Sequence, residues 1–257
     1  MFRGLIKKAI GLYLLPLRGN DKLFYYVKGT FFTDGTEHLY WATRYIKRRG
    51  GGVPKDSIII DVGGFNGGTA LYFASQFEGL KVYCIEPNSK MLPSLKEVEA
   101  ANERIRVRNI ALGAARGEAT LHVTSNDLSS SLNELSAEEL RRTPESFQEM
   151  LREERSIQVR VSTLDDEFAD APPVLLIKLD TQGTELDILK GGTEVLRKTK
   201  FVLAEMNNHR FYKNTCQYYE VDEYLRGRGF RLVDVVVSYR GDDGVTEYDA
   251  LYENLSL

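Results

Sequence analysis

The chain has 257 residues, a length typical of one α/β domain with short additions. Its 42% hydrophobic and 28% charged residues are ordinary for a globular protein, and a net charge of −3 gives no global reason to expect nucleic acid as a partner. Its two cysteines, Cys84 and Cys216, lack the spacing of metal ligands, so we expect no metal site. Cys84 lies in an apolar stretch, which favours a buried free thiol and a cytoplasmic protein.

The first 50 residues are basic. They hold ten Lys and Arg residues against three Asp and Glu residues, a net charge of +7 that leaves −10 for residues 51–257. The apolar stretch 9–17 is far short of the roughly 20 residues that span a bilayer, and no signal-peptide cleavage pattern follows it. As a helix, residues 1–17 would have one apolar and one basic face. We expect this helix to pack on its own domain; peripheral contact with the inner face of a membrane is the alternative.

A helix is expected over residues 36–49, ended by Gly50-Gly51-Gly52 and Pro54. This glycine run predicts the boundary between a basic, mainly helical extension (1–50) and the main domain (51–257). Strand and helix patterns then alternate, which is typical of a parallel sheet with helices on both faces. The expected strands are 58–62, 80–85, 105–110, 174–179 and 200–205, and the expected helices are about 67–77, 89–101 and 184–198.

Two further strands, Phe230–Val237 and Tyr248–Glu253, are joined by a short turn and should be antiparallel neighbours. The expected fold is therefore α/β and Rossmann-like: a doubly wound, mostly parallel seven-stranded sheet with a terminal antiparallel hairpin. Residues 126–155 interrupt the alternation between the third and fourth parallel strands. Their charged run from Ser136 to Arg155 predicts a helix, with Ser136 and Glu139 spaced as a capping box. This segment is either a solvated helix or a lid over the substrate.

A glycine-rich turn follows the first strand, from Asp61 through Gly63, Gly64, Phe65 and Asn66 to Gly67. A strand, a glycine turn and a helix N-terminus together make a site for a nucleotide-like ligand. A dinucleotide fingerprint has glycines at offsets zero, two and five, and Phe65 stands at offset two from Gly63. The spacing Asp-x-Gly-x-x-x-Gly favours S-adenosylmethionine instead, because this ligand has no phosphate and carries a sulfonium cation that Asp61 can attract.

An acid also ends the second strand. Glu86, followed by Pro87 and Asn88, lies 25 positions after Asp61, near the ~20 expected for the acid that holds a ribose. A carboxylate at this place can accept hydrogen bonds from both ribose hydroxyls. Ala111 and Leu112, after the next strand, are expected to border the adenine by backbone contact and apolar packing.

A second cluster surrounds Asp180, at the carboxyl end of a central strand where doubly wound folds place ligands. We therefore expect Asp180 to face the ligand cleft, in contact with the cofactor. Gly183 allows a tight turn, and Thr184 can cap the following helix. Glu185 is interpreted as a charge that favours the helix dipole.

These segments together resemble the FkbM family of methyltransferases. The resemblance covers about residues 57–254 and is carried by the following motifs: Ile60-Asp61-Val62-Gly63, Ile85-Glu86-Pro87-Asn88, Ala111-Leu112-Gly113, Thr163-Leu164-Asp165-Asp166, Ile177-Lys178-Leu179-Asp180 with Gly183 and Glu185, and Leu189-Lys190-Gly191-Gly192. It implies a class I S-adenosylmethionine fold and O-methylation of a hydroxyl, often on a sugar or polyketide. This chain has Thr181-Gln182 where the family often has a hydrophobic residue and Glu, so Gln182 supplies no carboxylate.

A hydroxyl acceptor benefits from a base that takes its proton. The candidates are Asp180, Glu205 and His209, which follow neighbouring strands on one sheet edge. We expect a small-molecule or glycan acceptor. Three alternatives stay open at this point: a nicotinamide oxidoreductase, a nucleic-acid methyltransferase, whose usual motifs are missing here, and a catalytically silent S-adenosylmethionine-binding scaffold. Nearby aromatic residues either form a wall for a sugar ring or belong to the core: Phe211, Tyr212, Tyr218 and Tyr219.

Overall fold

The computed structural model describes residues 37–49, 54, 56–141, 148–149, 151–208, 211–241 and 244–257. The predicted helix over residues 1–17, the glycine run 50–52 and His209 lie outside the described residues. By its internal contacts the chain divides into a short unit, residues 1–41, and a large one, residues 42–257. The predicted domain boundary at residue 50 stays a prediction. None of the described helices has both the length and the apolar character needed to cross a bilayer.

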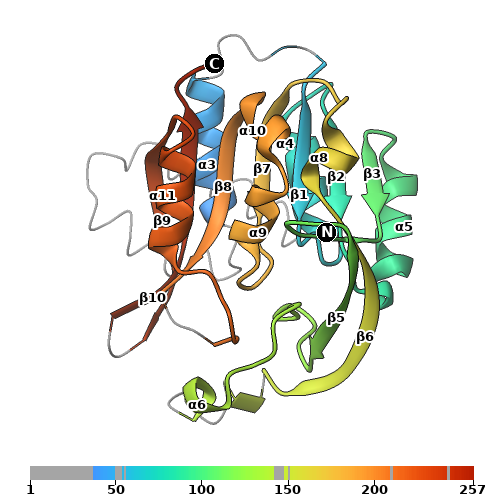
Figure 1. Cartoon of the computed structure of the whole chain (residues 1–257). Helices are drawn as coiled ribbons and strands as arrows, with labels where there is room; N and C mark the ends of the chain where they lie inside the picture. The colour runs from blue at the N-terminus through green and yellow to red at the C-terminus, as the bar shows by residue number, and fades with distance from the viewer. Residues whose placement is uncertain are drawn as a thin grey trace, which may run out of the picture. The chain divides into compact units, whose positions relative to one another are not determined.

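A seven-stranded sheet forms the centre of the large unit (Figure 1). Its order is β3-β2-β1-β7-β8-β10-β9, and the first five of these strands are parallel. Strand β10 is antiparallel to both its neighbours, so the last two strands form the terminal hairpin. The predicted fold class is confirmed. The strands are β1 (Ile58–Val62), β2 (Lys81–Ile85), β3 (Ile105–Arg108), β7 (Val174–Leu179), β8 (Thr199–Asn207), β9 (Phe230–Gly241) and β10 (Gly244–Asn254).

The middle of the sheet is the most deeply buried part of the fold. All five residues of β1 and all six of β7 are buried, as expected for parallel strands covered on both faces. Branched side chains such as Ile58, Ile59 and Ile60 suit such strands. One residue of β7, Lys178, is charged and nevertheless buried.

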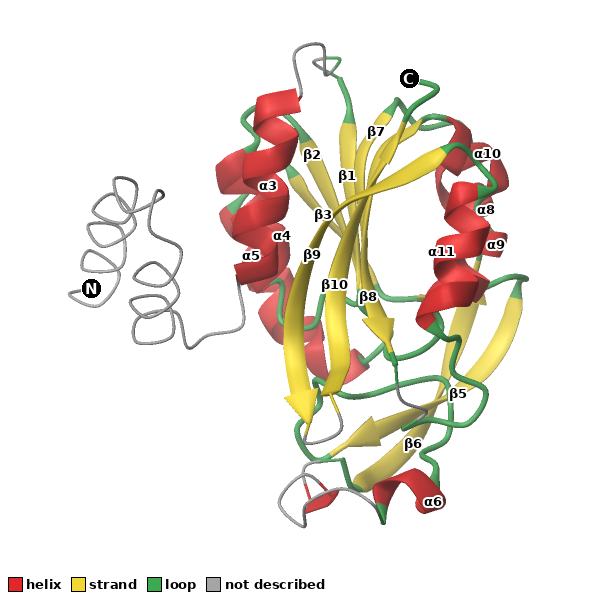
Figure 2. Ribbon diagram, turned by 90° about the vertical axis from the view of Figure 1, so that its left-hand side faces the viewer, coloured by secondary structure: helices red, strands yellow, loops and turns green. Residues whose placement is uncertain are grey.

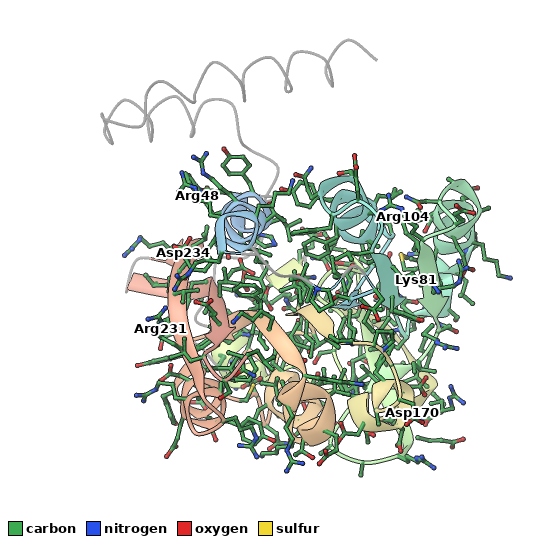
Figure 3. The ribbon with its side chains drawn as sticks, turned by 90° about the horizontal axis from the view of Figure 1, so that it is seen from above. Arg48, Lys81, Arg104, Asp170, Arg231 and Asp234 are labelled. Carbon is green, nitrogen blue, oxygen red and sulfur yellow. The ribbon has the colours of Figure 1, made fainter. Side chains whose placement is uncertain are left out.

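Helices cover both faces of the sheet, which Figures 2 and 3 show from two further directions. One layer contains α4 (Gly68–Gln76), α5 (Leu92–Ala101) and the part of α3 (Glu37–Arg49) that belongs to the large unit, residues 42–49. The short helix η2 (Ser89–Met91) precedes α5. Residues of α3 in the large unit contact the sheet, since Tyr45 packs edge-on against Phe201 and Arg49 pairs with Glu253. The opposite layer contains α8 (Leu164–Phe168), α9 (Glu185–Lys190), α10 (Thr193–Arg197) and α11 (Tyr218–Arg226).

The single helix predicted over 184–198 is two helices, α9 and α10, separated by Gly191 and Gly192. The break brings the backbone close to its neighbours. A Cβ on Gly191 would lie 2.1 Å from the carbonyl oxygen of Gly113, and a Cβ on Gly192 would lie 2.6 Å from the Leu164 side chain. Tertiary packing therefore decides the conformation here, rather than helix propensity.

A second, three-stranded sheet, β4-β6-β5, lies below the carboxyl ends of the parallel strands (Figure 2). Its strands are β4 (Ala111–Leu112), β5 (Gly117–Thr124) and β6 (Glu153–Ser162). The continuous helix predicted from 136 to 155 is wrong. Helix α6 covers only Ala137–Leu140, and residues 153–155 are strand because they pair with Val123 and Thr124 of β5. The hydroxyl of Ser136 does accept a hydrogen bond from the N–H of Glu139, as the capping pattern predicts.

Candidate active site

The topology brings the candidate residues to one edge of the large sheet. Strands β1, β2, β7 and β8 are parallel, so the residues that end them share the same edge. Asp61 lies near the end of β1, Glu86 follows β2, Asp180 follows β7, and Glu205 lies near the end of β8. Positions 25 to 144 residues apart in the sequence therefore meet at this edge, the carboxyl edge of the sheet.

The turn after β1 has the geometry that glycines permit. Gly63 and Gly67 have positive φ angles of 78° and 85°, and Phe65 is also left-handed at 46°. A Cβ on Gly63 would lie 1.8 Å from the carbonyl oxygen of Asp180, and one on Gly64 would lie 2.2 Å from Sγ of Cys84. These positions exclude side chains, because the turn lies directly against its neighbours. The buried thiol of Cys84 confirms the sequence interpretation.

Glu86 joins this turn to the end of β2. Its Oε2 accepts a hydrogen bond from the N–H of Phe65 at 2.9 Å, and its Oε1 accepts one from the N–H of Asn88 at 2.7 Å. An ionised carboxylate has about four acceptor positions, so each oxygen keeps one for a further donor. Burial raises the pKa of Glu86 to about 7. The two N–H donors and the charge of Lys178 act in the opposite direction, because they favour the ionised form.

The other residues predicted to bind the cofactor have more local roles in the structure. The side chain of Asn88 accepts from the N–H of Lys90 and thereby caps η2, and the side chain of Asn66 accepts from the N–H of Gly68. Ala111 and Leu112 are buried and form β4. Their contact with an adenine, like that of Pro87 with the cofactor, stays a prediction.

Asp180 is more accessible than Asp61, Glu86 and Glu205, the other acids of this edge. One third of its side chain is accessible, and its Oδ2 accepts from Nζ of Lys178 at 2.9 Å. Gln182, with a left-handed φ of 58°, donates through Nε2 to Oε2 of Glu205 at 2.7 Å, and the same nitrogen lies 3.5 Å from Oδ1 of Asp180. The structure thus brings together Asp180 and Glu205, two of the three predicted catalytic residues, with Gln182 between them.

The carboxyl edge concentrates negative charge around Glu205. This residue is buried and faces Asp249 across the β8–β10 pair, while Glu247 is two residues further along β10. Burial, together with the charges of Asp180 and Glu247, raises the pKa of Glu205 well above its usual range. The same causes, burial first and Asp180 second, raise the pKa of Glu247 to about 7. Glu205 therefore holds its proton more firmly than an ordinary carboxyl group does.

The interpretation of Glu185 as a capping charge needs correction. Glu185 lies in the first turn of α9, but its side chain is fully buried. It accepts hydrogen bonds from the N–H groups of Thr181 and Gly183 and from the Thr181 hydroxyl, so it fixes the loop after β7. Thr184 makes no side-chain cap; its hydroxyl donates to the Thr181 hydroxyl. The turn that Gly183 was expected to allow is present, with a φ of 102°.

The segment after β5 also contacts the loop that follows β7. The Ser131 hydroxyl donates to the carbonyl oxygen of Gln182 at 2.8 Å, and the Asn133 amide donates to that of Gly183 at 3.3 Å. The phenol of Tyr212, which is buried, donates to the carbonyl oxygen of Ser129. The left-handed Gln182 is thereby fixed by contacts on both sides. A role of residues 126–155 as a lid stays a prediction.

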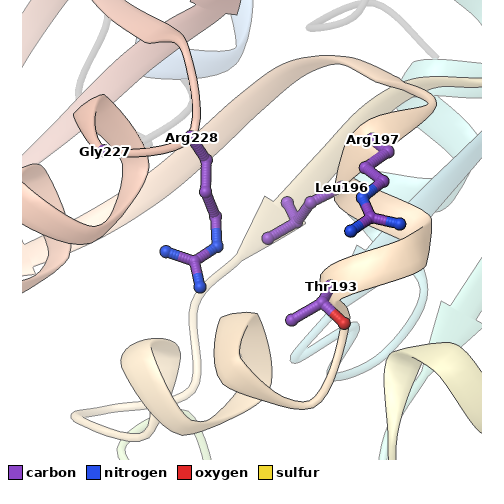
Figure 4. Close-up of a pocket in the computed structure, with 5 residues that line it drawn as sticks. All are labelled: Thr193, Leu196, Arg197, Gly227 and Arg228. Atoms are coloured by element: carbon purple, nitrogen blue, oxygen red, sulfur yellow. The ribbon is translucent and has the colours of Figure 1, made fainter.

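A hollow of about 420 Å³ lies at the opposite edge, near the amino ends of β8 and β9 (Figure 4). It is lined by Thr193, Leu196, Arg197, Gly227 and Arg228. Arg197 is paired with Glu194, and the Arg228 guanidinium stacks 3.4 Å from the centre of the Tyr224 ring. None of the residues predicted to act in chemistry lies there.

The residues at the carboxyl edge fit S-adenosylmethionine. Both carboxylate oxygens of Asp61 are buried without a hydrogen-bond donor among the described residues, and Nζ of Lys178 lies 3.7 Å from Oδ1. This leaves acceptor capacity beside the glycine turn. Glu86 has acceptor positions left for a ribose, and Gly63, Gly64 and Gly67 bring the turn close to its neighbours without side chains of their own.

A sheet in this order, with a terminal antiparallel hairpin, a glycine turn after β1 and an acid after β2, fits the class I S-adenosylmethionine-dependent methyltransferases expected from the sequence. The family model described as "Methyltransferase FkbM domain" matches residues 61–232. That range is well over half of the chain, and the chain belongs to the FkbM methyltransferase family. The predicted family is thus confirmed. The matched residues are therefore a methyltransferase domain, for which S-adenosylmethionine is the cofactor.

Two curated proteins are similar to the chain. The 2-O-methyltransferase NoeI of Sinorhizobium fredii is 27% identical over 162 residues, which are 62% of this chain and 66% of NoeI. Methyltransferase 1 of Beauveria bassiana is 26% identical over 54% of this chain and 59% of its own length. The chain thus matches less than two thirds of each relative. Among solved structures, the fibrillarin/Nop5p complex contains a chain with a TM-score of 0.48 and 14% identity, over 82% of this chain and 79% of that one.

Three residues at this edge had no role in the sequence interpretation. Lys178 was visible as a lone charge in an apolar strand, which is the signal of a buried ion pair. Glu247 and Ser131 gave no such signal, because both lie in polar stretches and reach the edge only through the hairpin and the second sheet.

Proposed function

We propose that the protein transfers the methyl group of S-adenosylmethionine to a hydroxyl oxygen of a sugar, a glycan or a related small metabolite. The observation that carries this proposal is Asp180, a partly exposed carboxylate on the carboxyl edge beside the cofactor turn. Its position suits the removal of a proton from an acceptor hydroxyl. The name of one relative, a 2-O-methyltransferase, supports oxygen as the atom that is methylated.

The roles of the residues follow from their surroundings. The bound cofactor supplies an activated methyl group, so the chain mainly has to hold the acceptor oxygen at about 3–3.5 Å in a dry cleft. Asp180, paired with Lys178, is the candidate base for the hydroxyl proton. Glu205, whose pKa is raised, and the amide of Gln182 are suited to orient the acceptor. His209 stays a candidate base from the sequence.

The experiment uses S-adenosylmethionine with a tritiated methyl group and a panel of acceptors, beginning with nucleotide-sugars and lipid-linked glycans. The expected product carries label that resists alkaline hydrolysis, as an ether does and a methyl ester does not. Asp180→Asn should lower kcat by about 10²–10⁴-fold, the usual contribution of a general base. Asp170→Asn, at an exposed loop position, is the matched control. Label found only on nitrogen or on carboxyl groups would contradict O-methylation.

Two further expectations remain proposals. The cytoplasmic location and the peripheral membrane contact through residues 1–17 rest on the sequence alone. Salt-sensitive binding to anionic vesicles, abolished by removing residues 1–17, would support the contact. Binding that is equal with and without this segment would contradict it.

A further inference from the structure

Lys178 is a buried cation between the glycine turn after β1 and Asp180, which follows β7. Only 3% of its side chain is accessible, in a strand whose other five residues are apolar. Its Nζ lies 2.9 Å from Oδ2 of Asp180, 3.7 Å from Oδ1 of Asp61 and 3.4 Å from the carbonyl oxygen of Gly63. One ammonium group thus contacts the acid of the cofactor turn, the backbone of that turn and the candidate base.

The register of the sheet makes this contact specific. Asp61 and Lys178 are direct partners in the parallel pair of β1 and β7, the two central strands. Burying an ammonium group is costly unless it is paired and hydrogen-bonded. Burial lowers the pKa of Lys178, but the charges of Asp180 and Asp61 raise it by more. The net pKa is therefore above the usual value for lysine, and the group stays protonated.

The buried carboxylate of Asp61 depends on the nearby charge of Lys178. Its carboxylate is fully buried, and burial raises its pKa to about 6. Lys178 lowers this pKa, whereas the charge of Asp180 raises it. Without the ammonium group, the buried carboxylate of Asp61 would face the partly exposed carboxylate of Asp180 uncompensated, and like charges disfavour ionisation of both groups. Among the residues that the structure describes, the titratable groups that interact with Lys178 are Asp61, Cys84, Glu86, Asp180 and Glu205.

We propose that Lys178 is a positioning residue for methyl transfer: it keeps the carboxylates of Asp61 and Asp180 ionised together and fixes Asp180 against the cofactor turn. The proposal rests on the proposed function, in which Asp180 accepts the proton of the acceptor. A proton taken up by Asp180 would occupy the base. Lys178 prevents this while it remains out of contact with solvent.

The test follows the protonation of the two acids and needs neither acceptor nor cofactor. Aspartate labelled with ¹³C at the side-chain carboxyl is titrated by NMR between pH 4 and 9, in the full chain and in Lys178→Met. Asp61→Asn and Asp180→Asn assign the two signals. In Lys178→Met the apparent pKa of the pair should rise by at least about one unit, a tenfold gain in proton affinity. Lys190→Met removes an exposed lysine beside Asp187 and should leave both signals unchanged.

A second variant covers the case in which Lys178→Met does not fold. Lys178→Met/Asp61→Asn removes one positive and one negative charge, so it should fold, and the remaining Asp180 should titrate as a single group. Restored folding in this double variant supports the proposal. Signals of Asp61 and Asp180 that titrate alike with and without Lys178 would overturn it, as would a double variant that is no better folded than Lys178→Met. The titration needs no methyl transfer, so a failure of this proposal can be distinguished from a failure of the proposed function in the assay above.

Discussion

Oε2 of Glu86 accepts a hydrogen bond from the backbone N–H of Phe65 over 2.9 Å, and this contact joins the end of β2 to the glycine turn after β1. The two segments that would enclose the nucleoside of the cofactor are therefore already connected within the protein. Phe65 has a left-handed φ of 46°, an uncommon conformation for a bulky residue, and the contact with Glu86 helps to maintain it. The turn is thus shaped before a ligand binds.

The charge of Glu86 makes stability depend on pH. Its pKa is about 7 in the folded chain and near 4.5 when exposed, so between these values the folded state binds more protons than the unfolded state. The free energy of unfolding should therefore fall as pH rises from about 4.5 to 7, by up to about 3 kcal/mol from this group. Urea unfolding at several pH values should show a flatter profile for Glu86→Gln. An unchanged profile in that variant would contradict the assignment.

Gly63 should not tolerate a side chain. Gly63→Ala places a Cβ 1.8 Å from the carbonyl oxygen of Asp180 at a φ of 78°. The variant should lose at least about 2 kcal/mol of unfolding free energy, from backbone strain and from overpacking. Gly117→Ala is the control, because a Cβ there meets nothing within 4 Å. Equal denaturant midpoints for the two variants would show that the turn is not packed against β7 in this way.

Ser131, in the segment after β5, should stabilise the loop after β7. Ser131→Ala removes a hydroxyl that donates to Gln182 and accepts from the N–H of Asn133. The expected loss is about 1–2 kcal/mol, and hydrogen exchange at Gly183 should become faster. Ser75→Ala removes an exposed hydroxyl bonded only within its own helix, and it should change stability by less than about 0.5 kcal/mol. A Ser131→Ala protein as stable and as protected as this control would refute the role.

Much of the fold was predictable because its signals are local. The run Ile58–Val62 is a strand with the predicted bounds, and the glycine turn directly after it has the left-handed angles that its composition requires. The terminal hairpin followed from a short turn between two apolar stretches, although its strands extend further than predicted. At the site, Asp180 and Glu205 come together because parallel strands end at a common edge.

The remainder depends on contacts between distant segments. Residues 153–155 have the charged composition of a solvated helix, but pairing with β5 makes them strand. Glu185 has the sequence position of a capping residue, and only its burial against Thr181 and Gly183 shows its actual role. Lys178 was visible in the sequence, yet its partners lie on another strand and beyond its own strand end.

The most direct test of the account is calorimetric titration with S-adenosylhomocysteine, with NAD as the control ligand. The intact chain should bind the first ligand at micromolar concentration and not the second. Glu86→Ala should weaken this binding at least tenfold, about 1.4 kcal/mol, because it removes the acceptor proposed for the ribose. Glu97→Ala, on the exposed face of α5, should bind like the intact chain. Equal affinity of the Glu86→Ala and Glu97→Ala variants, or binding of NAD, would contradict the site described here.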